Sequence, residues 1–505
     1  MGLGDKAKPF PVEIMKKEVV APLRSSTLLQ EHWLPMSNLD LLFPSQLKFA
    51  VVLCYKNPTL GPQASENGDS FISSLKKSLA QVLVPFYPLA GEVVQNSVGE
   101  PEIWCNNRGV EFIEAYADIE LKKLNLYNLD ESFVAGKLVP ENKHDILVVQ
   151  LTKLKCGSVI VVCLFDHRIS DGYSASLFMV SWAKFVRSRP LSYNNHPSFR
   201  RSLLNPRRFG YIDTSVHDMY GNLVTTPENT SPSLLDDDPF IISNRLYYIK
   251  AEHIKHLQTL ASLNNNNNVT KLETFSAFLW KLIAKHSSSS DNKEKLCRVA
   301  IVVDGRKLLA GDGREDNVMN NYFGNVLSCP FWDKKVSDLN REPLDQVAKQ
   351  VHECLETVAM KEHFLGMVDW VESLRPKSGI FGLSSYKMDD ERSIIVSSGL
   401  RFSIVEVDFG WGRPILGTFQ FPMGMRTMTK GGYVLPILIP IGNGDWVVYM
   451  HLHTSQLEFI EKEASNFLKP LTFDYLSSRV EQHMDQRSRL RPYQKKECIN
   501  INSKI

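Results

Sequence analysis

The sequence carries almost no net charge, because 58 Lys and Arg residues face 56 Asp and Glu residues and leave a formal charge of +2. Binding to nucleic acid needs a concentrated positive field against the phosphates, so this balance excludes it and leaves room only for a local anion pocket. The chain also lacks a run of about 18 apolar residues, which a membrane-spanning helix requires. We expect neither nucleic acid nor a membrane as a partner.

Closely spaced cysteine pairs are also absent from the sequence. None of the eight cysteines forms a Cys-x-x-Cys motif or a Cys/His cluster of the zinc-binding type. Cys54 and Cys163 stand in apolar runs, which favours buried free thiols in a reducing compartment. No secretory signal is expected, so we place the protein in the cytoplasm. The alternative is the peroxisome, because Ser503, Lys504 and Ile505 differ by one side chain from Ser-Lys-Leu.

Three catalytic or nucleotide-binding motifs are missing too. Without a Gly-x-x-x-x-Gly-Lys-Ser/Thr loop, a P-loop ATPase is disfavoured. Without a Gly-x-Ser-x-Gly elbow, the same holds for an α/β-hydrolase, and no Gly-x-Gly-x-x-Gly follows a strand. His451 and His453 share one face of an expected strand, but no third ligand accompanies them, so we predict no metal site.

What is present is the composition of an ordinary globular protein, with 43% hydrophobic and 23% charged residues. Strands and helices alternate, which predicts an α/β (α+β) fold in two similar-sized domains. The expected parts are an N-terminal domain over 1–190, a crossover linker over 191–240, a C-terminal domain over 241–476 and a polar, mobile tail over 477–505.

Hydrophobic periodicity places the individual elements. We expect strands at 13–20, 49–55, 147–151, 158–164, 298–303, 401–407, 434–440 and 445–452. We expect helices at 70–83, 174–186, 342–361 and 455–467. A further helix begins with a capping box, in which Thr270 caps the helix and Glu273 reaches back to the amide of Thr270.

The first candidate for chemistry lies between a buried strand and a helix and reads Asp166-His167-Arg168-Ile169-Ser170-Asp171-Gly172. Histidine suits general base work near neutral pH. Asp171 follows four residues later and would either orient His167 or anchor the loop through an arginine. Gly172 allows a tight turn or a close approach of the backbone. A purely structural His–Asp pair remains the alternative, since His-x-x-x-Asp alone is a common spacing.

The second candidate is the segment Asp408-Phe409-Gly410-Trp411-Gly412-Arg413-Pro414. Two glycines and a tryptophan after a strand are typical of a rigid corner. In such a corner Asp408 would pair with a basic group such as Arg413 or hold backbone amides.

The two motifs together resemble the plant BAHD acyltransferases. Four further segments match that family in the expected order, namely Ser37-Asn38-Leu39-Asp40, Phe86-Tyr87-Pro88-Leu89-Ala90-Gly91, Asp304-Gly305-Arg306 and Tyr322-Phe323-Gly324-Asn325. The resemblance covers roughly residues 13–476. It implies two chloramphenicol-acetyltransferase-like domains with an active-site channel at their interface. It also implies acyl-CoA as co-substrate, no permanently bound cofactor and a monomer.

The resemblance also assigns roles to the motif residues. His167, Asp171 and Asp408 become the catalytic set, with His167 as the general base that deprotonates the acceptor hydroxyl. Asp171 is expected to be structural and to pair with Arg306, and Asp408 to hold the domain interface. Thr270 and Lys271 match the family segment that opens the capped helix, and a helix N-terminus beside a lysine suits the phosphates of CoA.

The acceptor is inferred from the segment before the second motif. Transferases acting on shikimate or quinate usually carry Thr-Ser-Trp there, whereas this chain has Ser397-Ser398-Gly399, so the pocket wall loses a large ring. This segment looks more like that of coniferyl alcohol acyltransferases, which use acetyl-CoA. The alternatives are a hydroxycinnamoyl-CoA transferase acting on a shikimate- or quinate-like or other alcohol or amine, and an inactive ligand-binding relative. The pocket or structural candidates are Gly172, Arg306, Ser398, Gly399 and Trp411.

Overall fold

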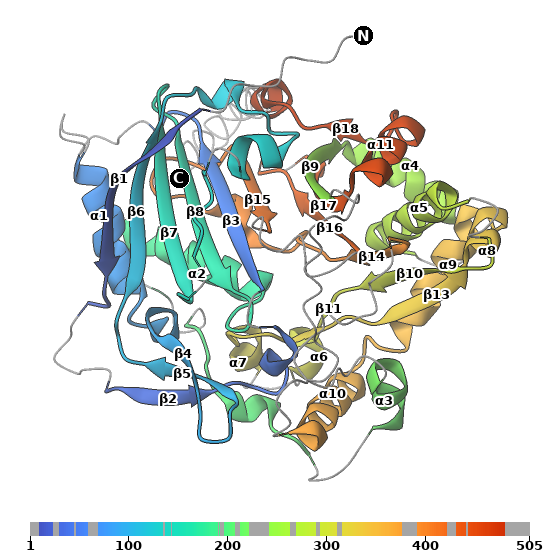
Figure 1. Cartoon of the computed structure of the whole chain (residues 1–505), viewed down its shortest axis with the longest axis horizontal. Helices are drawn as coiled ribbons and strands as arrows, with labels where there is room; N and C mark the ends of the chain where they lie inside the picture. Colours follow the sequence, from blue (N-terminus) through green and yellow to red (C-terminus); the bar gives the residue numbers. More distant parts are fainter. Residues whose placement is uncertain are drawn as a thin grey trace, which may run out of the picture.

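The computed structural model shows two large β-sheets that lie side by side, each with its own helices (Figure 1). The residues it describes are 10–23, 30–44, 47–58, 69–134, 137–142, 144–189, 191, 196–207, 213–221, 242–262, 269–288, 293–310, 316–375, 391–421, 431–440 and 443–479. Within these ranges no helix is long and apolar enough to cross a membrane.

The first sheet has six strands. Their order is β1 (Val12–Val20), β6 (Val110–Ala117), β7 (Leu147–Leu154), β8 (Val159–Asp166), β3 (Lys48–Tyr55) and β15 (Leu416–Gln420). Strands β3 and β8 are buried along their whole length, as their unbroken apolar runs predict. Helices α1 (Asp69–Val82) and α2 (Gly172–Val186) pack on each other, and Trp182 of α2 donates to the carbonyl of Leu75 in α1.

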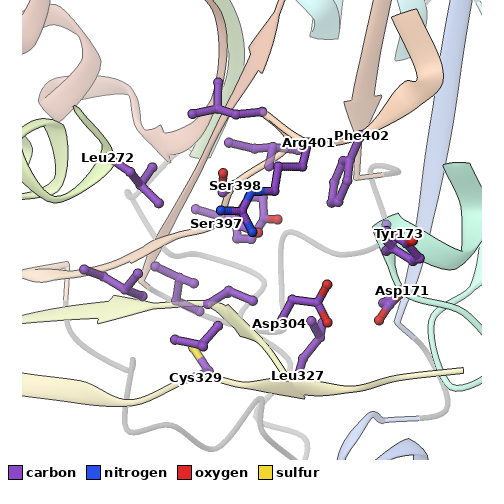
Figure 2. Close-up of a pocket in the computed structure, with 18 of the residues that line it drawn as sticks. Asp171, Tyr173, Leu272, Asp304, Leu327, Cys329, Ser397, Ser398, Arg401 and Phe402 are labelled. Atoms are coloured by element: carbon purple, nitrogen blue, oxygen red, sulfur yellow. The ribbon is translucent and has the colours of Figure 1, made fainter. Parts of the chain in front are cut away.

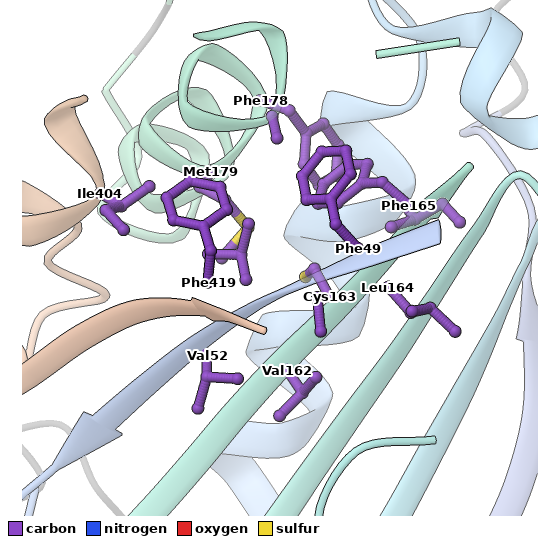
Figure 3. Close-up of a cluster of buried hydrophobic side chains, with 14 of the residues drawn as sticks. Phe49, Val52, Val162, Cys163, Leu164, Phe165, Phe178, Met179, Ile404 and Phe419 are labelled. Carbon is purple, nitrogen blue, oxygen red and sulfur yellow. The ribbon is translucent and has the colours of Figure 1, made fainter. Parts of the chain in front are cut away.

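Aromatic side chains join α2 to this sheet (Figure 3). The ring of Phe178 in α2 lies edge-on to that of Phe165 in β8, with centroids 5.9 Å apart. Phe165 in turn contacts Phe49 of β3, and Phe49 contacts Phe419 of β15. The aromatic cluster therefore holds the end of β8, after which His167 follows.

The second sheet has seven strands. Their order is β13 (Phe331–Lys335), β10 (Leu296–Ile301), β14 (Ser393–Val396), β16 (Gly432–Leu438), β17 (Trp446–His453), β9 (Ile242–Ile249) and β18 (Lys469–Pro470). Its own helices are α4 (Ala251–Ser262), α5 (Lys271–His286), α8 (Val336–Arg341), α9 (Leu344–Glu356) and α11 (Thr454–Glu463). These helices and one face of the sheet share a separate hydrophobic core.

Smaller elements complete the described chain. They are the sheet β2 (His32–Pro35), β5 (Pro101–Cys105) and β4 (Glu92–Gln95), the pair β11 (Val303–Asp304) and β12 (Leu327–Ser328), and the helices α3 (Thr214–Tyr220), α6 (Arg306–Leu309), α7 (Asp316–Asn320) and α10 (Lys361–Leu374). The single turns near the site are η1 (Asp40–Leu42) and η11 (Ser403–Glu406).

Most of the expected elements are confirmed, within a few residues at their ends, but one is wrong. The expected strand at 401–407 is the 3₁₀ turn η11, whose Ile404 packs its side chain near Gly417 of β15. The helix expected at 342–361 is α9, which ends five residues earlier, at Glu356. Apolar periodicity did not identify the turn because its hydrophobic residues are buried in either conformation.

The two sheets do not follow the two halves of the sequence. Strand β15 comes from the second half, yet it pairs antiparallel with β3 in the first sheet, with Gln420 opposite Ala50. The expected linker contains α3, and its residues 222–240 lie outside the described ranges. The expected tail is described only to Arg479, whose guanidinium pairs with Asp445 at 3.1 Å; residues 480–505 lie outside the description. The described cysteines are free thiols, as expected.

Candidate active site

A cavity of about 840 Å³ lies between the two sheets. Residues of both sheets line it, among them His167 after β8 and Tyr449 on β17. Figure 2 shows Asp171, Tyr173 and Asp304 near one wall and Ser397, Ser398 and Arg401 near another. A channel at the domain interface is therefore confirmed.

His167 is half-buried and lines this cavity directly after β8. Its ring stacks on Phe43 with centroids 4.4 Å apart and meets the edge of Phe49 at 4.9 Å. Burial lowers the pKa of His167, although its own backbone, Asp171 and Asn325 act in the opposite direction. The imidazole is therefore neutral at pH 7, which is the form a general base requires.

The amide of Asn325 decides which nitrogen of His167 is free to act. Its Nδ2 donates to Asp40 Oδ1 at 3.0 Å and to the carbonyls of His167 and Arg168 at 2.8 and 3.2 Å. The opposite amide orientation would set an oxygen against three acceptors, so Oδ1 is the atom that faces His167 Nδ1 at 3.2 Å. Nδ1 therefore donates, and Nε2 keeps the lone pair that can accept a proton.

Asp171 forms a buried ion pair with Arg306, as expected. Both side chains are 1% exposed, and the guanidinium donates to the two carboxylate oxygens at 2.8 and 3.1 Å. Asp171 Oδ1 also caps α2 by accepting from the amide of Ser174 at 2.8 Å. In this geometry Asp171 positions the His167 loop against the second domain, and it has no direct catalytic contact of its own.

Arg306 is the centre of this network. It also donates to Asp304 at 3.1 Å and to the carbonyls of Tyr322 and Gly324 at 3.2 and 2.8 Å. Since Gly324 directly precedes Asn325, the same network holds the segment that orients His167. The neighbouring carboxylates raise the pKa of Arg306 despite its burial, so it stays charged.

Asp408 lies in a turn and is not among the described residues that line the cavity. Its carboxylate accepts from the amides of Gly410 and Gly412 at 2.8 and 2.9 Å, and both glycines have positive φ, at 95° and 87°. Its cationic partner is Arg187 after α2, at 3.2 Å. The expected pairing with Arg413 is wrong, the expected hold on backbone amides is confirmed, and the geometry gives Asp408 a positioning role in place of a catalytic one.

Trp411 is structural. Its ring packs edge-on against Tyr55 of β3 and Phe71 of α1, with centroids 5.3 and 5.4 Å apart. The turn is thereby fastened to the first domain, at a distance from the cavity lining.

The two glycines proposed for the pocket act through one aromatic ring. A Cβ at Gly172 would lie 2.6 Å from Cε2 of Phe402, and a Cβ at Gly399 would lie 3.1 Å from its Cδ2 and 2.9 Å from Ile437 Cγ1. Ser398 and Phe402 line the cavity, whereas Gly399 is not among its described lining residues. Gly399 therefore does not simply leave a gap in the wall; it makes room for Phe402.

Thr270 and Lys271 lie at the mouth of the cavity, where both are exposed. The capping box is confirmed: Thr270 Oγ1 accepts from the amide of Glu273 at 3.2 Å, and Glu273 Oε2 accepts from the amide of Thr270 at 2.7 Å. Two further exposed cations line the cavity, Lys307 and Arg401. Sequence reasoning missed these two because no local pattern links them to the capped helix.

A second histidine in the cavity is held in the same manner as His167. The amide of Asn244 donates to Asp130 Oδ1 at 2.6 Å, so its Oδ1 accepts from His451 Nδ1 at 2.7 Å and from the hydroxyl of Tyr449 at 2.5 Å. Within the described ranges no group of three or more His, Cys, Asp or Glu side chains is placed to hold a metal ion. The Nδ1 of His451 therefore has a protein partner.

Asn325 is the main functional residue that sequence reasoning left without a role. The Tyr-Phe-Gly-Asn segment was recognised, but the contact with His167 spans 158 positions and leaves no periodic signal. The cavity aromatics Phe43 and Phe49 were missed for the same reason.

Known proteins match this chain over most of its length. The model of the Transferase family matches residues 10–467. The omega-hydroxypalmitate O-feruloyl transferase of Arabidopsis thaliana is 28% identical over 72% of this chain and 76% of its own length. The shikimate O-hydroxycinnamoyltransferase of Nicotiana tabacum is 25% identical over 90% of this chain and 100% of its own.

Solved structures share the fold. Vinorine synthase superposes with a TM-score of 0.65 at 18% identity, over 91% of this chain and 99% of its own. TRI101 of F. graminearum, complexed with coenzyme A and deoxynivalenol, superposes with a TM-score of 0.69 at 15% identity, over 87% and 99%. The two-domain α/β fold is thus confirmed, and the chain belongs to the Transferase family, as an acyl-CoA-dependent acyltransferase of the BAHD type.

Proposed function

We propose that this enzyme transfers an acetyl group from acetyl-CoA to the hydroxyl of an aromatic plant alcohol such as coniferyl alcohol. The observation that carries the proposal is a neutral, oriented His167 set in an aromatic cavity. Phe43, Phe49, Phe402 and Phe419 line that cavity together with His167. Such walls suit a flat aromatic acceptor, because offset or edge-on ring contacts stabilise it beyond simple burial.

The reaction is a direct transfer. Nε2 of His167 accepts the proton of the acceptor hydroxyl as its oxygen attacks the thioester carbonyl. A C–O bond forms, and the tetrahedral oxyanion then collapses with cleavage of the C–S bond. The proton on Nε2 passes to the departing sulfur, which leaves as CoA thiol and returns His167 to its neutral form. Both substrates meet at one histidine, so no acyl-enzyme is required.

The phosphates of CoA would bind at the cavity mouth. Lys271, Lys307 and Arg401 are exposed there and supply positive charge. The N-terminus of α5 adds the partial charge of its dipole, although the Glu273 carboxylate already occupies part of that end. We therefore propose that the lysines contribute more than the helix dipole.

A hydroxycinnamoyl donor is the second candidate. It is supported by relatives named for feruloyl and hydroxycinnamoyl transfer and by the cavity volume of about 840 Å³. A panel of purified acyl-CoA donors against coniferyl alcohol, shikimate and quinate decides between the two candidates, with release of free thiol as the readout.

Replacement of His167 by Ala tests the base. We expect kcat to fall by roughly 10²- to 10⁴-fold, the usual range for general base catalysis. His253→Ala is the matched control, because His253 on α4 is outside the described cavity lining and should keep the parental kcat. A His167→Ala variant with a kcat close to that of the parent would disprove the assignment.

A further inference from the structure

Asp40 is a buried carboxylate beside the base but outside the cavity. It begins the turn η1, is 0% exposed and is not among the described residues that line the cavity. The same turn reaches the base, because Phe43, which directly follows η1, stacks its ring on that of His167. Burial of an ionised side chain is costly unless its oxygens are paired, so the position of Asp40 calls for an explanation.

Each carboxylate oxygen of Asp40 accepts two hydrogen bonds. Oδ1 accepts from the backbone amide of Asn325 at 2.7 Å and from its Nδ2 at 3.0 Å. Oδ2 accepts from the backbone amide and the hydroxyl of Ser37 at 3.0 and 2.7 Å, and the guanidinium of Arg201 lies 3.6 Å away. One oxygen thus fixes Asp40 within its own segment, and the other holds both the backbone and the side chain of Asn325.

The remaining acceptors of Asn325 Nδ2 are less able to fix it. They are the carbonyls of His167 and Arg168, which belong to the loop that carries the base and therefore move with it. Of these three acceptors the Asp40 carboxylate alone is charged, and hydrogen bonds to a charged group are about twice as strong as neutral ones. Asp40 therefore ties the amide to a part of the fold outside the loop.

We propose that Asp40 is a positioning residue for the base: through Asn325 it keeps the His167 imidazole in the tautomer whose lone pair is on Nε2. In a Ser-His-Asp triad the carboxylate contacts the histidine directly and selects its tautomer. Asp171 does not do so here, because Arg306 pairs with both of its oxygens. The inference rests on His167 as the base of the proposed transfer, and it adds the residue that sets its tautomer.

Asp40→Asn tests the proposal. An amide has one oxygen, so it cannot accept from Asn325 and from the backbone amide of Ser37 at once. We expect kcat to fall by roughly 10- to 100-fold, the usual cost of releasing a group that orients a reacting side chain. KM for both substrates should change by less than about threefold, because Asp40 is outside the described cavity lining. A kcat within about twofold of the parental value overturns the proposal.

Asp445 supplies the matched control. It is 3% exposed, accepts from the amide of Ala251 at 2.8 Å and from Asn443 Nδ2 at 2.6 Å, and pairs with Arg479 at 3.1 Å. It too is outside the described cavity lining. Asp445→Asn should lower the unfolding midpoint and leave the kcat of the folded protein unchanged. An equal fall of kcat in Asp445→Asn and Asp40→Asn would trace the effect to lost stability and overturn the proposal.

A double-mutant cycle shows whether Asp40 acts through Asn325. In Asn325→Ala protein the intermediate amide is already lost, so Asp40→Asn should change kcat further by less than about threefold. A further loss as large as that seen in the parent would mean that Asp40 acts by another route and would overturn the proposal.

The pH profile adds a readout that lost stability does not move. The hydrogen bond to Asn325 raises the pKa of His167, so the acid limb of kcat/KM should shift to lower pH in Asp40→Asn. The carboxylates of Asp166 and Asp171, which also raise this pKa, are unchanged in the variant. An acid limb that stays in place, or moves to higher pH, contradicts the proposal.

NMR of protein with isotope-labelled histidine reports the tautomer without any substrate, and His167→Gln assigns the signal. The parent should carry its proton on Nδ1, and Asp40→Asn should show a shift toward Nε2. A parental proton on Nε2 overturns the proposal even where Asp40→Asn fails to fold. If no acceptor reacts but the tautomer shifts, the proposed function fails and the positioning by Asp40 stands. If transfer occurs and the tautomer of Asp40→Asn stays parental, the positioning by Asp40 is refuted.

Discussion

Replacement of Asp171 by Asn separates a positioning carboxylate from a catalytic one. Asn keeps the size of the side chain and is an equally good helix N-cap, so Ser174 still has its cap. What is lost is the charge opposite Arg306, which is 1% exposed. Breaking a buried pair costs about 3–5 kcal/mol. Because Asp304 and two carbonyls still contact the guanidinium of Arg306, we expect Asp171→Asn to lower the free energy of unfolding by about 3 kcal/mol, the lower end of that range.

Urea-induced unfolding followed by tryptophan fluorescence measures this loss. Asp171→Ala is the control, and its free energy of unfolding should be lower than that of Asp171→Asn by about 1 kcal/mol, because this change also removes the N-cap of α2. The kcat of the folded Asp171→Asn protein should change less than about tenfold, since the Nδ1 of His167 bonds to Asn325. The acid limb of its kcat/KM profile should shift to lower pH, because the charge of Asp171 raises the pKa of His167. Near-parental stability with a kcat about 100-fold lower would refute this reasoning and make Asp171 a direct partner of the base.

Three shorter predictions follow from the same geometry. Burial lowers the pKa of His167 below its ordinary 6.5. The value of kcat/KM should therefore be at its plateau at pH 7 and fall as the pH drops through that pKa. A midpoint of the acid limb above pH 7 would contradict this prediction. Asp408→Ala should lower the thermal unfolding midpoint more than Arg187→Ala does, because the Asp408 carboxylate also accepts hydrogen bonds from two backbone amides. The ion pair itself contributes little, since both of its side chains are 27% exposed. The reverse order of the two midpoints in calorimetry would contradict this prediction. Gly172→Ala should push the Phe402 ring from its rotamer and raise the acceptor KM by about two- to tenfold with little change in stability, and an unaltered KM would show that the ring yields freely.

The fold was predictable where the hydrophobic pattern was strong. The apolar run of β8 and the amphipathic period of α1 place these elements within a few residues. The capping box at Thr270 was equally readable, because its two hydrogen bonds join residues only three positions apart. The prediction of a strand at 401–407 was wrong because its apolar residues are compatible with a strand and with a buried 3₁₀ turn.

The sequence alone determined the chemical type of the protein. Its near-zero charge gave no sign of a phosphate-backbone partner, and the order of its motifs led to the prediction of His167 as the base and to the pair of Asp171 with Arg306, which the structure contains. These conclusions depend on residue identity and local spacing, which a single chain displays directly.

The tertiary structure decided everything that depends on contacts between distant segments. It placed Asn325 against His167, across 158 positions, and so left Nε2 as the ring nitrogen that can accept a proton. It also made Arg187 the partner of Asp408. Such contacts form only when the two sheets pack together, and no short-range period in the sequence encodes which side chains then meet.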